Sequence, residues 1–272
     1  MALAACLVIS GCVSEQVALS YSFPPMQMAR YLWTIDGVVH SKSPAEITTR
    51  RLIAEIRVDE ESLDPSDRGR PRLLVSIRPT KIVEDGVEAA LDLTITMELE
   101  VDASGRVSRL IRSSALPPGP MQRLELDRIF LESRPVLPPT PVGIGDTWSA
   151  PQRARAENSS IDLDGMGRLV NFRVEKRSRL ANIEIERSGD ITTRQTVGRG
   201  TASAQGTTTS RTHASIDIDR GIASLLTSVS SSEFALTLGG EIQAGTVKVD
   251  ITSTMKLVSI EQLERRSVDQ GS

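Results

Sequence analysis

Alternation of apolar and polar residues is the feature that most constrains the fold of this chain. Over residues 87–101 every odd position is apolar, namely Val87, Ala89, Leu91, Leu93, Ile95, Met97, Leu99 and Val101, whereas the even positions are polar or small. Successive side chains of a β-strand point to opposite faces of its sheet, so this pattern predicts a strand with one buried and one solvated face.

The same alternation recurs over residues 247–257 and, in shorter form, over residues 52–58, 73–77, 170–174 and 234–238. A buried face opposite a wet face is typical of antiparallel sheets. A strand covering residues 87–101 would reach about 50 Å, so a sheet of such strands must twist and coil to stay compact. We therefore expect a mainly β fold, with long curved antiparallel strands forming a half-barrel and with one or two helices.

Helix and connector signals divide the chain into two β-rich halves. Pro120 can begin a helix over residues 120–132, because proline lacks a backbone N–H and the N–H groups of the first turn have no partner within the helix. Prolines are excluded from sheet interiors, so residues 135–141, with four prolines, predict an extended connector. The predicted halves are then residues 12–134 and 142–272.

Two polar segments are interpreted as loops. The Thr- and Ser-rich residues 202–211 predict a loop or an edge hairpin, and the acidic residues 59–61 predict a solvated loop. A weak repeat also relates residues 99–111 to residues 216–226, each with a strand, an Asp, a glycine turn and a second strand. Gly105 and Gly221 can supply the positive φ of tight hairpins. The repeat leaves both duplication into two similar halves and chance similarity open.

Charge and rare residues exclude several function classes. Lys and Arg number 32 against 35 Asp and Glu, a net charge of -3 that argues against nucleic-acid binding. Two His and two Cys make a metal site improbable, and no cofactor is expected. Since His40 and His213 are the chain's imidazoles and no nucleophile elbow, P-loop or zinc motif occurs, we predict a non-enzymatic protein.

The amino terminus carries an apolar stretch over residues 2–10, followed by Gly11 and Cys12. The segment Ile-Ser-Gly-Cys resembles the lipobox of bacterial lipoproteins, which implies cleavage before Cys12 and lipid on its thiol. Residues 1–11 would then be a signal peptide, and because it is short and lacks a basic residue we expect it to begin upstream of Met1. Val13 rather than Asp favours, by the same resemblance, the outer membrane facing the periplasm. The alternative is an apolar first strand with two buried thiols.

Residues 142–148, Val-Gly-Ile-Gly-Asp-Thr-Trp, resemble the V-G-x-G-D-x-W segment of uncharacterised secreted lipoprotein domains. The simplest interpretation is a glycine turn in which Asp146 accepts backbone hydrogen bonds and Trp148 plugs the domain edge. A functional alternative makes Trp148 a lid on a pocket.

The apolar concave face of a curved sheet needs a cover, either a helix or a ligand. The expected architecture resembles the half-barrel lipoprotein carriers of bacterial envelopes, a likeness of architecture alone. It predicts an envelope protein, attached to the membrane through its lipid anchor, that binds a lipid or other hydrophobic ligand. The candidate ligand-binding residues are Leu93, Met97, Trp148, Ile251 and Met255. The alternative is a structural or protein-interaction lipoprotein with a closed core and no ligand.

Overall fold

The computed structural model describes residues 15–89, 93–113, 126–155, 159–175, 177–197, 200–238 and 242–263. In these residues the chain forms thirteen strands and one helix, α2 (Leu126–Ser133). The strands are β1 (Gln27–Lys42), β2 (Ile47–Leu63), β3 (Arg72–Glu84), β4 (Val87–Ala89), β5 (Ile95–Val101), β6 (Val107–Ser113), β7 (Thr147–Ser149), β8 (Gln152–Arg155), β9 (Ser159–Glu175), β10 (Ser178–Val197), β11 (Gly200–Asp217), β12 (Ile222–Leu238) and β13 (Ile242–Gln262).

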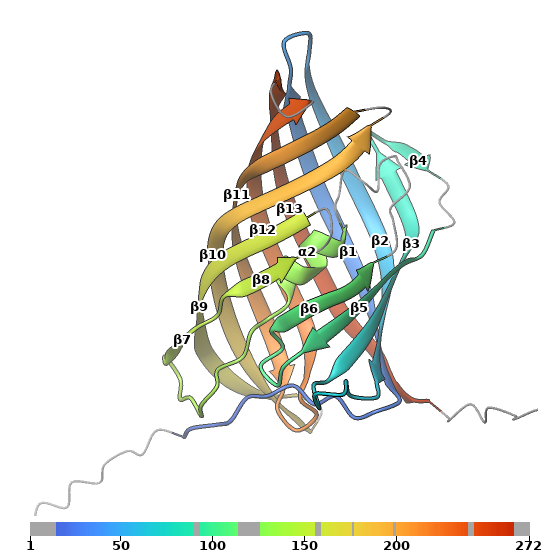
Figure 1. The fold of residues 1–272 in the computed structure, drawn as a ribbon. Helices are drawn as coiled ribbons and strands as arrows, with labels where there is room; N and C mark the ends of the chain where they lie inside the picture. Colours follow the sequence, from blue (N-terminus) through green and yellow to red (C-terminus); the bar gives the residue numbers. More distant parts are fainter. Residues whose placement is uncertain are drawn as a thin grey trace, which may run out of the picture.

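All the strands belong to one antiparallel sheet with the order β6-β5-β3-β2-β1-β13-β12-β11-β10-β9-β7, to which β4 adds on β3 and β8 on β9. Because β1 pairs with β13, the two halves of the chain form one continuous sheet. On the opposite side β6 and β8 approach each other, and in the described residues no strand pairing joins them. The sheet is therefore a nearly closed barrel (Figure 1), and the predicted mainly β, half-barrel-like fold is confirmed.

Alternation along the strands decides which side chains fill the barrel. On β1, Trp33 and Ile35 are each 1% exposed, whereas their neighbour Leu32 is 45% exposed. Strands β2, β3 and β5 continue this inner wall with the buried side chains Leu52, Ala54, Ile56, Val58, Leu73, Val75, Ile77, Ile95, Met97 and Leu99. The hydrophobic core thus lies inside the barrel, as burial of one face of each strand requires.

The strand expected over residues 87–101 is interrupted. It forms two strands, β4 and β5, which both pair with β3. Asp85 and Gly86, with φ of 50° and 84°, make a tight turn that folds β4 back onto β3, and Val87 is 71% exposed. The prediction of one long strand is wrong, although the odd positions of Ile95–Val101 do face the core.

Both segments expected to be loops are strands. Residues 202–211 lie in β11, between β10 and β12, since β-branched Thr suits a pleated surface. The acidic residues 59–61 lie in β2, where Asp59 pairs with Arg30 and Glu60 faces inward. The loop predictions are wrong because neighbouring strands supply partners for these polar side chains, on the outer face for Asp59 and in the interior for Glu60.

Helix α2 lies inside the barrel and contacts β8, β11 and β12 (Figure 1). Its apolar side chains Leu126, Ile129, Phe130 and Leu131 are buried, and the Phe130 ring meets the Trp33 ring of β1 edge-on at a centroid distance of 6.3 Å. The predicted helix over residues 120–132 is confirmed at its C-terminal end, whereas residues 120–125 lie outside the described residues. The cover that the concave face requires is therefore supplied by the chain itself.

The amino-terminal segment crosses one end of the barrel and contacts two similar turns. Gly105 and Gly221 have φ of 82° and 61°, the positive values predicted for these turns. Tyr21 N–H donates to the carbonyl of Ala103, and Ser22 N–H donates to that of Gly221. A Cβ on Gly221 would lie 2.6 Å from the Ser22 nitrogen, so this close approach requires glycine.

Candidate ligand site in the barrel interior

The inner wall is apolar on one side of the barrel and partly polar on the other. Strands β1, β2, β3 and β5 contribute mostly apolar side chains, with Glu60 and Ser62 of β2 as buried polar exceptions. Strands β11 and β12 instead place six buried hydroxyl groups on the inner face, which we name the hydroxyl patch: Thr208, Ser210, Thr212, Ser228, Ser230 and Ser232. The interior is therefore amphipathic, because the inner wall of the barrel has an apolar part and a part that carries hydroxyl groups.

The hydroxyl patch is ordered by strand register. Thr208 lies opposite Ser232, Ser210 opposite Ser230, and Thr212 opposite Ser228. The Thr208 and Ser232 hydroxyls are 2.8 Å apart, and the Thr212 hydroxyl donates to Ser228 Oγ at 3.1 Å. Buried hydroxyls normally have such partners, since an unpaired one costs free energy.

Arg187 lies beside this patch, because its position on β10 pairs with Ser210 of β11. Its guanidinium donates to three carbonyl oxygens, from Nε to Ala150 at 3.0 Å, from Nη1 to Glu132 at 2.6 Å and from Nη2 to Arg134 at 3.0 Å. The Glu132 carbonyl belongs to the last turn of α2, where a cation complements the helix dipole. Burial lowers the pKa of Arg187 to about 10, so the side chain stays charged at neutral pH.

Two further buried ion pairs connect the helix and the connector to the wall. Within α2, Arg128 Nη1 lies 2.5 Å from Glu132 Oε1 and 3.4 Å from the Ser232 hydroxyl. After the helix, Arg134 Nη1 lies 2.9 Å from Glu60 Oε1 of β2. In each pair the two opposite charges compensate each other, which matters because an uncompensated buried charge is strongly destabilising.

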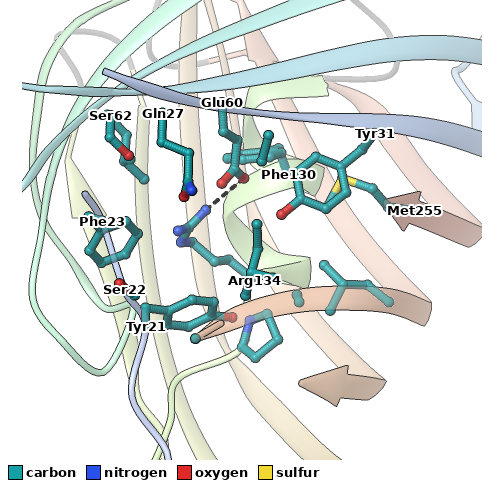
Figure 2. Close-up of a pocket in the computed structure, with 17 residues that line it drawn as sticks. Tyr21, Ser22, Phe23, Gln27, Tyr31, Glu60, Ser62, Phe130, Arg134 and Met255 are labelled. Atoms are coloured by element: carbon teal, nitrogen blue, oxygen red, sulfur yellow. Dashed lines mark hydrogen bonds and ion pairs between the residues drawn. The ribbon is translucent and has the colours of Figure 1, made fainter. Parts of the chain in front are cut away.

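Figure 2 shows the small cavity around this second ion pair. Tyr21, Tyr31, Glu60, Phe130 and Arg134 are among its lining residues, and its volume is about 20 Å³. A single water needs at least about 10–15 Å³, so the cavity suits one water molecule and is far too small for a lipid. With α2 in place, this cavity cannot serve as a lipid site.

Both tyrosines of the chain are buried in this region, and burial raises the pKa of Tyr21 and of Tyr31. Tyrosine in the unfolded chain ionises near pH 10, so the stability gained from these protonated side chains is complete below about pH 10 and falls at higher pH. The lowered pKa of Arg187 has the opposite sign and offsets part of this loss. We expect no tyrosinate absorbance from the folded protein at about pH 11. The absorbance of both tyrosinates should appear together when the protein unfolds at higher pH. Ionisation of a folded-state tyrosine near pH 10 would contradict this burial.

The structure places the predicted site residues in separate parts of the core. Met97 and Ile251 are buried in the walls formed by β5 and β13, and Leu93 packs against the core while remaining partly exposed. Met255 lines the small cavity. Cys12 lies outside the described residues.

Trp148 is buried on β7 and donates from Nε1 to the carbonyl of Val136 at 2.7 Å. A Cβ on Gly167 would meet its ring, so the glycine makes room for the indole. As expected for the turn before it, the Asp146 carboxylate accepts a hydrogen bond from Gly143 N–H at 2.8 Å. Trp148 thus fixes the connector against the sheet edge and does not line the small interior cavity.

Sequence reasoning missed the buried charges, although the alternation contains a signal for some of them. Arg187 is in phase with the inward residues Ile183, Ile185 and Ile191, and Glu60 is in phase with Ile56 and Val58. A charged residue at an inward position predicts an interior partner. For Arg128 and Glu132 the helical spacing of four residues is the corresponding signal.

The outer face of the sheet is hollowed into an open groove of about 1270 Å³ across β1, β2 and β9–β13. Ion pairs cross it, with Arg51 Nη2 2.6 Å from Asp36 Oδ2 and Arg211 beside Glu186. Outward-pointing Val229 and Met166 are each 55% exposed in the same groove. The groove offers a mixed surface, with charged and hydroxyl side chains beside exposed apolar ones.

Both histidines lie on strands with exposed rings. His40 Nδ1 is 3.0 Å from the Thr49 hydroxyl, and His213 Nε2 is 3.8 Å from a Glu184 carboxylate oxygen. In the described part of the chain, no group of three or more His, Cys, Asp or Glu side chains could hold a metal ion. No helix within the described ranges is long and apolar enough to cross a membrane.

Comparison with known proteins identifies a similar fold but no family to which the chain belongs. No protein-family model matches the chain, and no curated protein matches it. A solved structure described as lipid–protein interactions in lipovitellin aligns with a TM-score of 0.51 and 11% identity over 90% of this chain and 26% of that one. This chain thus spans about a quarter of the lipovitellin chain, and the likeness shows the fold alone. An outer membrane channel from Pseudomonas putida F1 aligns over 88% of this chain and 97% of its own, with 7% identity and a TM-score of 0.25, too low to carry an argument.

Proposed function

We propose that this protein is a non-enzymatic, lipid-anchored envelope protein that binds a lipid or other hydrophobic ligand inside its barrel, in the space that α2 occupies. The observation that carries the proposal is that one short helix covers an amphipathic inner wall in a barrel whose β6 and β8 edges are not paired in the described residues. A ligand with matching chemistry can replace the helix.

The size of α2 is consistent with such an exchange. Eight residues make a helix about 12 Å long and about 10 Å across. The cylinder that it fills is roughly 900 Å³, within the range of about 300–1,000 Å³ that is typical of ligand pockets. Displacement of α2 would therefore turn a one-water cavity into a site of ligand size.

The contacts of the residues that follow α2 are compatible with its displacement as a unit. Its neighbour Arg134 is held by Glu60, and Leu137 N–H donates to the Ser104 carbonyl at 2.7 Å. These contacts lie after the helix, so they would keep the connector bound if α2 moved about residues 133–134. The lipovitellin likeness adds that a barrel of related architecture occurs in a protein described by its lipid interactions.

The anchor is proposed from the lipobox-like segment that ends at Cys12. Lipid on the Cys12 thiol would attach the protein to the envelope, with the outer membrane facing the periplasm as the favoured location. A tethered protein of this kind needs no spanning helix, because covalent acyl chains supply the membrane affinity.

One mass measurement tests both parts. The full chain is purified from the envelope of an expressing bacterium and compared under native and denaturing conditions. We expect extra lipid mass that survives denaturation, mapped to Cys12 and absent from Cys12→Ser, and a second lipid mass that is present only under native conditions. A native mass equal to the denatured mass would contradict the ligand, and an unmodified Cys12 would contradict the anchor.

The second candidate function is that of a structural or protein-interaction lipoprotein. It is favoured by the one-water size of the interior cavity and by the open outer groove, which could receive a partner. This candidate predicts a chain that carries no native-only lipid and an interior that stays closed.

A further inference from the structure

The polar part of the barrel interior indicates the headgroup of the ligand, an inference that rests on the proposed function because it concerns the same interior. Arg187, Ser210 and Ser230 occupy one row across β10, β11 and β12. A wall that only enclosed hydrocarbon would carry Val, Ile or Leu at these inward positions, since buried polar groups need partners. The row therefore requires a polar occupant on the lumen side.

In the closed barrel α2 is that occupant. Arg187 Nη1 donates to the Glu132 carbonyl at 2.6 Å, and the Arg128 guanidinium lies 3.4 Å from the Ser232 hydroxyl. Departure of α2 removes both contacts. Arg187 would keep the carbonyls of Ala150 and Arg134, because neither belongs to the helix, and Nη1 would lose its acceptor.

The charge balance then favours an anion. The pairs Arg128–Glu132 and Arg134–Glu60 are each neutral, whereas the hydrogen bonds of Arg187 go to carbonyl oxygens. In the described residues no carboxylate lies at ion-pair distance from Arg187, and the nearby Glu132 would leave with α2. Such a buried guanidinium gains most from an ionised acceptor, because charge-assisted hydrogen bonds are about twice as strong as neutral ones. Hydroxyls of the patch can donate to the same oxygens.

Gln152 is a second, independent observation. It is fully buried on β8, and within the described ranges neither polar atom of its side-chain amide has a hydrogen-bond partner. Strand register places it in the row of Leu163, Gly189 and Thr208, next to the row of Arg187. An unpaired buried amide costs free energy, and a ligand oxygen in this region would satisfy its N–H groups.

We propose that the barrel interior binds an anionic amphiphile, whose carboxylate or phosphate accepts hydrogen bonds from Arg187, the hydroxyl patch and Gln152. Its hydrocarbon chain lies against the apolar wall of β1, β2, β3 and β5, in the space vacated by α2. The geometry thus assigns the two sides of the wall to the two ends of one ligand.

Three probes with the same oleoyl chain test the headgroup: oleate with a carboxylate, oleoyl lysophosphatidate with a phosphate, and monoolein without charge. Affinities for the full chain carrying Cys12→Ser are measured by calorimetric titration below the micelle concentration of each lipid. We expect the better of the two anions to bind at least about tenfold more tightly than monoolein, as one charged hydrogen bond provides. Whichever anion binds more tightly identifies the headgroup.

The ratio of interest is the affinity for the better anion divided by the affinity for monoolein. Arg187→Gln should lower this affinity ratio by about tenfold, whereas Arg187→Lys should keep most of it. The ratio is used because loss of the Arg187 contact also loosens α2 and changes all three affinities together. Arg211→Gln is the matched control, since Arg211 lies on the outer face of β11 beside Glu186, and it should leave the ratio unchanged. If Arg187→Gln fails to fold, Gln152→Leu replaces it, with a smaller fall in the ratio expected.

Equal affinity for oleate, lysophosphatidate and monoolein, or a ratio unchanged by Arg187→Gln, would overturn the anionic headgroup while leaving a hydrophobic ligand in place. Failure of all three probes to bind, together with a chain that carries no native-only lipid, would instead overturn the proposed function. The two failures are therefore distinguishable.

Discussion

Phe130→Ala is expected to loosen α2, so that the protein becomes less stable and yet binds oleate more tightly. The Phe130 side chain is buried and its ring meets Trp33 edge-on. Truncation of a buried Phe to Ala costs about 3–5 kcal/mol, and this cost falls on the state in which α2 fills the barrel. Because apparent affinity rises with the population of the competent state, we expect a gain of at least about tenfold in oleate affinity, measured by calorimetry beside urea unfolding.

Ile56→Ala is the control for this prediction. Ile56 is buried in the β2 wall of the same interior, and its truncation costs about 2–5 kcal/mol without removing an α2 side chain. It should lower stability with no gain in affinity. Equal loss of stability with no gain in either variant would mean that α2 is a permanent part of the core.

Glu60→Leu should be among the most destabilising single substitutions in the chain. It removes the carboxylate 2.9 Å from Arg134 and leaves a buried guanidinium uncompensated. Breaking a buried ion pair in this way costs about 3–5 kcal/mol. Urea unfolding monitored by circular dichroism should show the midpoint fall accordingly.

The double variant Glu60→Leu with Arg134→Met should recover most of the loss, because an apolar replacement of both partners removes the unpaired charge. Asp162→Leu, which removes an exposed partner of Arg153, is the surface control and should have a much smaller effect. A Glu60→Leu variant as stable as the surface control would show that water reaches Arg134.

The class of fold could be predicted from the sequence because each long strand repeats the same local rule. Ile95–Val101 has the inward positions that its alternation predicts, and Gly105 and Gly221 have the positive φ that their turns require. The interruption between β4 and β5 was missed, since Val87 and Ala89 keep the apolar phase of β5 although β4 pairs with residues 82–84 of β3 and β5 with residues 72–77. Periodicity reports which face is apolar and not where a strand stops.

The polar half of the interior could not be predicted from the alternation of apolar and polar residues. Arg187 sits on the apolar phase of β10, and its acceptors come from Ala150, Glu132 and Arg134, which lie far away in the chain. Thr208 and Ser232 look like loop residues until their strands are paired in register. Local patterns identify a buried charge as an exception, and the partners that stabilise it become visible only in three dimensions.

Of the candidate ligand-binding residues, Met97, Ile251 and Met255 are buried on the inner wall, because each lies on the apolar phase of its strand. Trp148 is held instead by the connector carbonyl of Val136. Helix α2 was predicted from the sequence, but its place inside the barrel was not, since the concave face was expected to need either a helix or a ligand. The proposed function joins these two covers as alternative occupants of one space.

The replacement of α2 by a lipid is tested most directly by amide hydrogen exchange over α2, measured with and without a saturating lipid. We expect exchange in Leu126–Ser133 to be slow in the free protein and to become fast with oleate or oleoyl lysophosphatidate, while β1 and β13 remain protected. Backbone amides in a buried helix are protected by their hydrogen bonds, and a helix displaced from the barrel loses that protection. Bound lipid with unchanged protection of α2 would contradict the account, as would α2 amides that stay protected because no lipid binds at all.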